Sequence, residues 1–153
     1  MLHEKERKAT TVTGSIPGVT APTITYKKGN ETLTAAPADA GDYTTSITLG
    51  EGENAKTASV EYSIEKATPT AENFSFTAPT DLIYNGKAKT AAIAPNTGIT
   101  GMGDVSVKFG RDGREVQNPT NAGTYTVKIA VIEGTNYATA SELTAERWKF
   151  TIA

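Results

Sequence analysis

The chain has 153 residues, which is room for one average domain or two small ones. Its net charge of −2 comes from interspersed charges of both signs without a basic stripe, so nucleic-acid or anionic-membrane binding lacks an electrostatic basis. The absence of cysteine excludes disulfides, zinc–thiolate sites and a cysteine nucleophile. No stretch approaches the roughly 20 apolar residues of a membrane span, and no signal-peptide pattern precedes the first strand. A signal and an anchor of a secreted parent protein are therefore expected outside this sequence.

The first half of the chain predicts short strands separated by turns. Residues 4–8 are a run of mixed charges, expected to be a solvated terminal segment or an edge strand. A strand around residues 24–26 ends at the Lys-Gly-Asn turn of residues 28–30. Two later strands alternate with period 2, which places one row of side chains from each strand on one face of a sheet. The rows are Tyr43, Thr45, Ile47 and Leu49, then Val60, Tyr62 and Ile64.

Residues 66–70, Lys-Ala-Thr-Pro-Thr, mark the predicted boundary between two modules. They follow the last apolar strand of the first half, and Pro69 cannot donate a hydrogen bond to a sheet ladder. We predict modules at residues 1–67 and 68–153. The connection is short, contains proline and lacks the Gly/Ser content of a flexible tether, so the modules are expected to sit end to end as a rod.

The second half predicts a more complete set of strands. An opening segment, residues 72–84, has no counterpart in the first half, so the first module is expected to be truncated or to close its sheet with residues 1–8. Residues 98–103 are rich in glycine but precede a strand rather than a helix, which indicates a flexible turn and not a phosphate loop. Residues 141–147 favour one helical turn or, equally, an elaborated loop or bulge before the last strand. The apolar rows are Val105, Val107 and Phe109; Tyr125, Val127, Ile129 and Val131; and Trp148, Phe150 and Ile152.

The two halves repeat each other. Residues 37–54 and 119–136 align without a gap at an offset of 82, and the flanking strands align with small gaps. The identical positions include Pro37/Pro119, Ala40/Ala122, Gly41/Gly123, Tyr43/Tyr125, Ile47/Ile129, Gly52/Gly134 and Asn54/Asn136. Several short strands at this spacing predict an all-β fold of two tandem small antiparallel β-sandwich modules.

The segments Pro-Ala-Asp-Ala-Gly-Asp-Tyr at residues 37–43 and Pro-Thr-Asn-Ala-Gly-Thr-Tyr at 119–125 resemble the tyrosine corner of immunoglobulin (Ig)-like sandwiches. Together with Tyr-Asn-Gly-Lys at residues 84–87, Glu-Gly-Thr-Asn-Tyr at 133–137 and the closing Phe-Thr-Ile, the pattern is similar to bacterial Ig-like repeats of the MBG type. Such repeats occur in tandem arrays of large cell-surface and adhesin-like proteins. The resemblance implies that Tyr43 and Tyr125 are structural, with each hydroxyl bonded to backbone just upstream.

The sequence has few residues that could form a catalytic, metal-binding or ligand-binding site. His3 is the only histidine and lies in a terminal segment, so a Ser-His-Asp arrangement within a folded core is not available. We predict no catalytic residue, no metal site and no cofactor. Tyr84, Tyr137 and Trp148 would be the aromatic residues of a sugar-binding platform, but Trp148 is in phase with core residues, and Tyr137 is retained as the ligand-surface candidate. A calcium site lacks the Asp-rich loop pattern, and a Lys–Asn isopeptide bond would need a buried lysine beside asparagine and a carboxylate.

The predicted function is a non-catalytic spacer or adhesion segment of an extracellular, bacterial cell-surface protein. Its expected partners are neighbouring repeats of the same polypeptide, with a glycan or a host surface protein as a further one, and the chain is expected to be a monomer. Two alternatives stay open: a glycan- or protein-binding module, and an accessory domain of a secreted carbohydrate-active enzyme.

Overall fold

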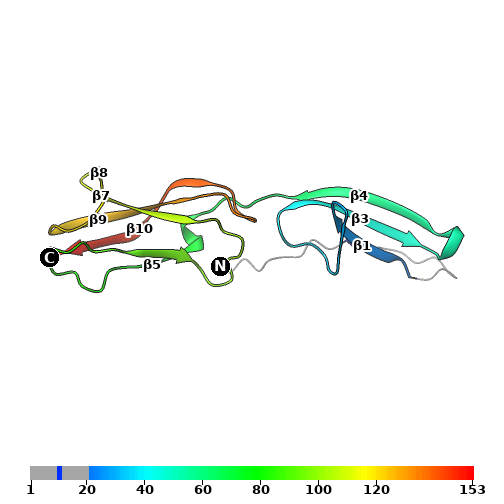
Figure 1. Cartoon of the computed structure of the whole chain (residues 1–153), viewed down its shortest axis with the longest axis horizontal. Helices are drawn as coiled ribbons and strands as arrows, with labels where there is room; N and C mark the ends of the chain where they lie inside the picture. Colours follow the sequence, from blue (N-terminus) through cyan, green and yellow to red (C-terminus); the bar gives the residue numbers. More distant parts are fainter. Residues whose placement is uncertain (1–9, 12–20) are drawn as a thin grey trace. The chain divides into compact units, whose positions relative to one another are not determined.

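The computed structural model describes residues 10, 11 and 21–153, and the chain divides into two compact units, Met1–Lys66 and Ala67–Ala153. The predicted all-β fold is confirmed, because the described elements are strands in antiparallel sheets together with two single 3-10 turns (Figure 1). Among the described residues, no helix is long and apolar enough to cross a membrane. His3, the charged run at residues 4–8 and the expected closing of the first sheet by residues 1–8 lie outside the described residues.

The first unit is built on one four-stranded antiparallel sheet in the order β2-β1-β3-β4. The predicted inward rows lie on the same face of this sheet, since Tyr43 is opposite Tyr62 and Thr45 is opposite Val60. The strands are β1 (Thr23–Lys28), β2 (Glu31–Leu33), β3 (Gly41–Leu49) and β4 (Lys56–Ile64), with a 3-10 turn at Gly52–Asn54.

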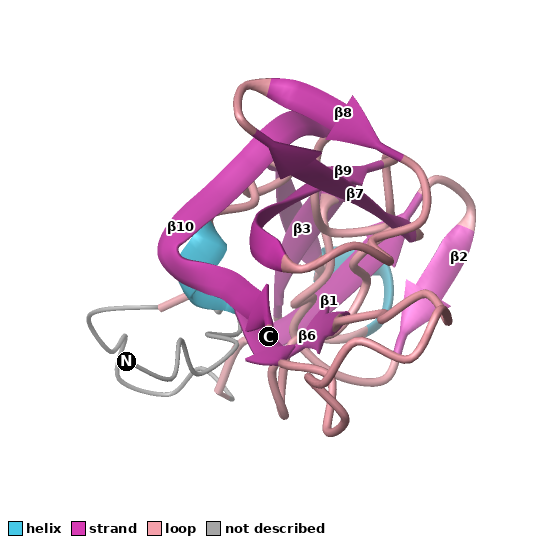
Figure 2. Cartoon of the chain, turned by 90° about the vertical axis from the view of Figure 1, so that its left-hand side faces the viewer, coloured by secondary structure: helices cyan, strands magenta, loops and turns pink. Residues whose placement is uncertain are grey.

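The second unit has two sheets, as a sandwich requires. A four-stranded antiparallel sheet in the order β10-β9-β7-β8 packs against a two-stranded antiparallel sheet of β5 and β6, and Figure 2 shows β6 on the opposite side of the unit from β8. The elements are a 3-10 turn (Ala71–Asn73), β5 (Phe74–Thr77), β6 (Ala92–Pro95), β7 (Val105–Arg111), β8 (Arg114–Val116), β9 (Gly123–Val131) and β10 (Ala140–Ile152).

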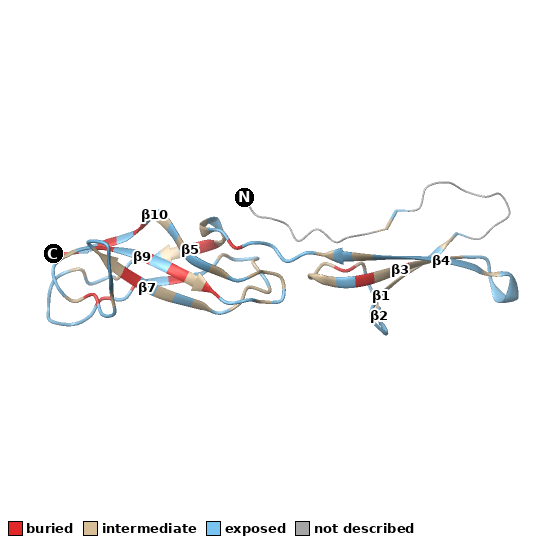
Figure 3. Ribbon diagram, turned by 90° about the horizontal axis from the view of Figure 1, so that it is seen from above, coloured by how far each residue is buried: buried red, intermediate tan, exposed pale blue. Residues whose placement is uncertain are grey.

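The core of the second unit lies between these two sheets (Figure 3). Phe74 of β5 meets Trp148 of β10 edge to face at 6.5 Å between ring centroids, and Tyr125 stacks on Phe150 at 5.5 Å. Alternate residues of β9 and β10 supply most of the buried side chains, which is the period-2 pattern read from the sequence. The buried cluster is Phe74, Ala91, Ile93, Phe109, Tyr125, Val127, Ile129, Val131, Trp148, Phe150 and Ile152.

Residues 141–147 are not helical. They belong to β10, whose register against β9 shifts between Ala140 and Leu143 and again between Thr144 and Lys149. The extra residues of the second half are therefore absorbed as β-bulges, which is the bulge alternative of the prediction. Pairing with β9 and burial of Trp148 outweigh the local helix propensity, which is a weak preference in any sequence.

The inner face of the first sheet is less covered than that of the second. Val60 of β4 corresponds to Trp148 of β10 in the sequence repeat, yet Val60 is 58% exposed and Trp148 is 1% exposed. Within residues 21–66 the structure has one sheet, whereas the second unit lays the two-stranded sheet β5-β6 over its large sheet. Among the described residues, the two halves thus share a strand pattern, and a second layer of strands covers the sheet of the second half.

Candidate functional site

The tyrosine corner has the same geometry in both units. The Tyr43 hydroxyl donates to the Asp39 carbonyl oxygen at 2.8 Å, and the Tyr125 hydroxyl donates to the Asn121 carbonyl oxygen at 2.8 Å. Both rings are buried, so each phenol fills the core while its polar atom is satisfied by the turn that precedes the strand. The corner holds the turn against the sheet and leaves no reactive group free.

A basic side chain covers each corner tyrosine, which the sequence interpretation did not include. The Lys28 Nζ and the Arg111 Cζ each lie 5.6 Å from the centroid of their tyrosine ring, Tyr43 and Tyr125 respectively. Arg111 also donates to the Tyr125 hydroxyl at 3.5 Å, and this bond is the first cause that raises the pKa of its guanidinium. Lys28 and Arg111 occupy matching positions two residues after Tyr26 and Phe109, which is the signal that could have revealed them.

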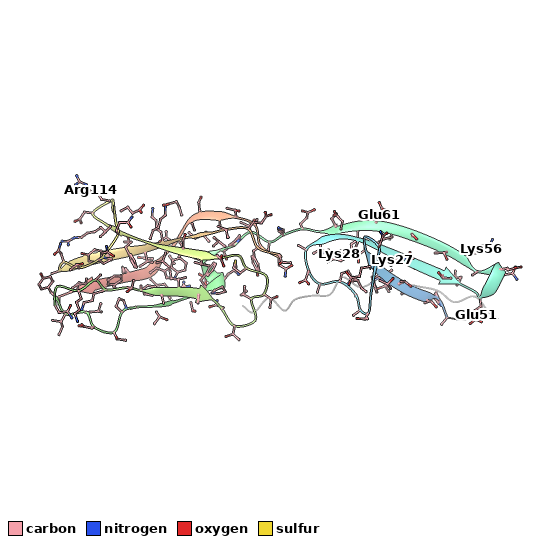
Figure 4. The ribbon with its side chains drawn as sticks, viewed as in Figure 1. Lys27, Lys28, Glu51, Lys56, Glu61 and Arg114 are labelled. Carbon is pink, nitrogen blue, oxygen red and sulfur yellow. The ribbon has the colours of Figure 1, made fainter. Side chains whose placement is uncertain are left out.

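A hollow with charged walls lies on the outer face of the large sheet of the second unit. We call it the charged hollow; its volume is about 140 Å³. Two glycines, Gly110 and Gly113, are among the residues that line it, and Arg114 extends outward from the start of β8 (Figure 4). The residues that line it are Lys108, Phe109, Gly110, Gly113, Arg114, Glu115, Thr126, Lys128 and Glu142.

Glu142 is the centre of the charge network in this hollow. Its carboxylate lies 2.7 Å from the Lys128 Nζ and 4.0 Å from the Lys108 Nζ, and Lys108 also lies 3.9 Å from Glu115. The hydrogen bond from Lys128, followed by its charge, lowers the pKa of Glu142. Glu142 has φ of 58°, a left-handed conformation that non-glycine residues rarely adopt. The bulge in β10 therefore aims this carboxylate at the two lysines, which is a recognised use of bulges.

Gly110 leaves space in the charged hollow because it has no side chain. It lies inside β7, has no positive φ, and a Cβ there would be 3.0 Å from the Thr126 Oγ1. The matching position in the first unit is Lys27, so the strand does not need glycine for its backbone conformation. A glycine inside a strand weakens it and commonly marks a place where another molecule or backbone approaches closely.

The other predicted residues do not come together at one site. Tyr137 is half-buried and lies just before β10, while Tyr84 is 54% exposed and donates its backbone N–H to Ala153 just after β10. Trp148 belongs to the core. The three aromatic residues therefore do not form one sugar-binding platform.

A buried lysine does lie beside an asparagine and a carboxylate. The Lys89 Nζ and the Asn85 Nδ2 both donate to the Asp81 Oδ2, at 2.7 and 2.8 Å, and Lys89 is 5% exposed. Asp81 is exposed, and its hydrogen bond from Lys89 lowers its pKa, so the carboxylate stays ionised at neutral pH. The geometry therefore makes an ion pair between Lys89 and Asp81, which we call the ion-pair lock and which ties the loop to the domain.

No group of three or more His, Cys, Asp or Glu side chains is placed to hold a metal ion in the part of the chain that the structure describes. The charged hollow offers cations, carboxylates and a hydroxyl in a shallow setting. This arrangement can bind a polar ligand through hydrogen bonds and paired charges.

Residues 77–145 match a family model described as MBG domain. The matched range begins at the last residue of β5 and ends inside β10, so it lies wholly in the second unit. No curated protein and no solved structure matches the chain. The relation of the first unit to this family therefore rests on the internal repeat.

Proposed function

We propose that this chain, whose second unit is an MBG domain and thus a bacterial Ig-like repeat, is a non-catalytic spacer or adhesion segment of a bacterial cell-surface protein. The observation that carries the proposal is the connection between the units. β4 ends at Ile64, and Ala67 already exchanges backbone hydrogen bonds with the second unit. The connection of two residues, 65 and 66, leaves little slack, which suits a chain of modules that must keep its reach.

The second unit also has the geometry of a spacer module taken alone. Its chain enters at Ala67, beside the segment that precedes β10, and leaves at Ala153, just after β10. Entry and exit therefore lie at opposite ends of a strand of 13 residues, which spans roughly 40 Å at about 3.3 Å per residue. Each such module adds its strand length to the reach of the polypeptide.

The proposal places the chain outside the cell, in keeping with the extracellular bacterial proteins in which MBG domains occur. It acts there as a monomer, with neighbouring repeats of the same polypeptide as its first partners. Reading the full-length gene for a signal peptide, a wall anchor and further repeats tests this placement directly.

Small-angle X-ray scattering tests the spacer proposal. The maximum dimension of the full chain is expected to exceed that of the isolated second unit by roughly one module length, about 35 Å. Repeating the measurement at high salt is the control, because charge-driven association of the units would be screened there. A full chain whose maximum dimension matches that of a single compact particle would contradict a spacer.

The second candidate is a ligand-binding module, and the charged hollow favours it. Glycan-array binding tests this candidate with Gly110→Lys, which restores in the hollow the side chain that the first unit carries as Lys27. Ser106→Lys is the matched control, because it adds the same charge to the outer face of the same strand beyond the hollow. Binding lost only in Gly110→Lys supports the hollow, whereas loss in Tyr137→Ala alone would move the site to Tyr137. An accessory role in a carbohydrate-active enzyme depends on which domains adjoin this chain.

A further inference from the structure

The two ends of the second unit are held by the same kind of backbone pairing. At the entry, the Ala67 N–H donates to the Asn136 carbonyl at 2.9 Å, and its carbonyl accepts from the Ala138 N–H at 2.9 Å. At the exit, the Ala153 N–H donates to the Leu82 carbonyl at 2.8 Å, and its carbonyl accepts from the Tyr84 N–H at 2.9 Å. We call these two sets of bonds the entry bridge and the exit bridge.

Both bridges have the parallel pattern. In a parallel pair, one residue donates to the neighbour before its partner and accepts from the neighbour after it. Ala67 bonds in this way around Tyr137, and Ala153 bonds in this way around residue 83. The terminal segments therefore run in the same direction as the segments that hold them.

This orientation decides how tension would load the bridges. The segment held at the entry leads directly into β10, and β10 ends at the residue before Ala153. Pulling the chain at Lys66 and at Ala153 therefore drives each terminal segment lengthwise past its parallel partner. The two hydrogen bonds of a bridge lie across that direction, so they are strained together instead of opening one after the other.

The strand between the bridges is firmly anchored. β10 pairs with β9, and its side chains Trp148, Phe150 and Ile152 are each at most 4% exposed in the core. Tension carried by β10 must therefore break the bridges or pull large buried side chains from the core, and the bridges have far less buried area to protect them.

We propose that the second unit is a load-bearing module in which the entry and exit bridges form a shear clamp. The inference rests on the proposed spacer function for its purpose, but it concerns resistance to force and not reach. The first unit offers a contrast, since within residues 21–66 all strand pairs are antiparallel and its last strand, β4, pairs with β3 alone. The first unit is expected to unfold at lower force than the second.

Optical-tweezers unfolding of the full chain at constant force tests the clamp. Ala67→Pro removes the N–H that donates to Asn136. It is expected to raise the unfolding rate of the second unit at a fixed force about fivefold, the effect of one hydrogen bond lost before the transition state. Thr68→Pro is the matched control, because no backbone hydrogen bond of the Thr68 N–H occurs in the described residues, and its unfolding rate should match the native chain.

A change of pulling direction keeps the test decisive if Ala67→Pro does not fold. Handles attached at residues 66 and 135 of the native chain load the same entry bridge by peeling, since both positions precede the residues that the bridge joins, Ala67 and Asn136 to Ala138. The clamp requires a lower unfolding force in this geometry than between residues 66 and 153. Equal unfolding rates of the two proline variants, or equal forces in the two directions, would overturn the clamp. Neither result would bear on the scattering test of the spacer.

Discussion

Each corner tyrosine is buried, donates a hydrogen bond to a turn carbonyl and lies under a basic side chain. The glycine two residues before the tyrosine leaves space for that basic side chain. Gly123 has φ of 143°, and a Cβ there would lie 2.6 Å from the Arg111 Cζ that covers Tyr125. Gly41 has φ of 149°, and a Cβ there would lie 3.1 Å from the Lys28 Cε. The Ala-Gly-x-Tyr segment therefore encodes a backbone turn, a space for a cation and a hydroxyl anchor within four residues.

Removing the corner hydroxyl should destabilise the second unit. Tyr125→Phe removes the hydrogen bond to the Asn121 carbonyl, which is expected to cost about 0.5–1.5 kcal/mol of unfolding free energy. Urea denaturation followed by circular dichroism measures the change. Tyr84→Phe is the control, because that ring is 54% exposed and should leave the unfolding midpoint in place. Equal effects of the two changes would contradict an anchoring role for the corner hydroxyl.

The ion-pair lock predicts a pH dependence of stability. The hydrogen bond from Lys89 lowers the folded pKa of Asp81, so the stabilisation is fully present above the unfolded pKa and is lost as the pH falls from there through the lower folded pKa. Thermal melts of native chain and Asp81→Asn across acidic pH should therefore differ most near neutral pH and converge at low pH. A constant difference between the two chains at all pH values would argue against the lock.

The residues of the charged hollow show what a sequence alone cannot supply. Tyr43 and Tyr125 could be assigned to a corner because the motif is local and occurs twice. Gly110, Lys128 and Glu142 are far apart in the chain and meet only through strand register, and Glu142 depends on a bulge that no pattern of residue types announces. The signal available in the sequence was Gly110, a glycine inside a predicted strand at the position where the first half has Lys27.

Strands with strict alternation could be predicted, and strands without it could not. The inward rows of β3, β7, β9 and the end of β10 follow period 2, so burial of one face fixes their secondary structure. β6 escaped prediction because its sequence, Ala-Ile-Ala-Pro, has a single large apolar residue and a proline. Its partner β5 supplies the aromatic side chains, so this two-stranded sheet forms through packing more than through the strand propensity of β6.

Substitutions at matching positions of the last strands, β4 and β10, compare how well the inner face of each sheet is covered. Trp148→Ala empties a fully buried site and should cost about 3–5 kcal/mol of unfolding free energy in the second unit. Val60→Ala, at the matching position of β4, removes a side chain that is 58% exposed and should cost less than about 1 kcal/mol in the first unit. Differential scanning calorimetry measures both, and similar costs at the two positions would show that the first sheet is covered as well as the second.

At the scale of the whole molecule, the two units differ in how much they bury. The second contributes almost all of the buried hydrophobic side chains, whereas Tyr43 is the buried one among the described residues of the first. Since burial of apolar surface supplies most of the stability of a small domain, equal stabilities are not expected.

Thermal unfolding should therefore occur in two steps, with the first unit melting at the lower temperature. Trp148 is the only tryptophan and lies in the core of the second unit, so its fluorescence reports that unit alone. Circular dichroism reports both units, and its first transition should precede the fluorescence transition. Coincident transitions by the two probes would indicate that the units unfold as one cooperative body.

The bonds of Ala67 also set where the second unit can be cut out for recombinant expression. A fragment that begins at residue 67 keeps the partner of Tyr137, whereas one that begins at residue 68 leaves the Asn136 carbonyl and the Ala138 N–H without it. Two edge groups would then face solvent at the start of the longest strand, and an exposed edge invites pairing with a second molecule. A fragment that begins at residue 67 is therefore expected to stay monomeric, whereas one that begins at residue 68 is expected to be prone to self-association.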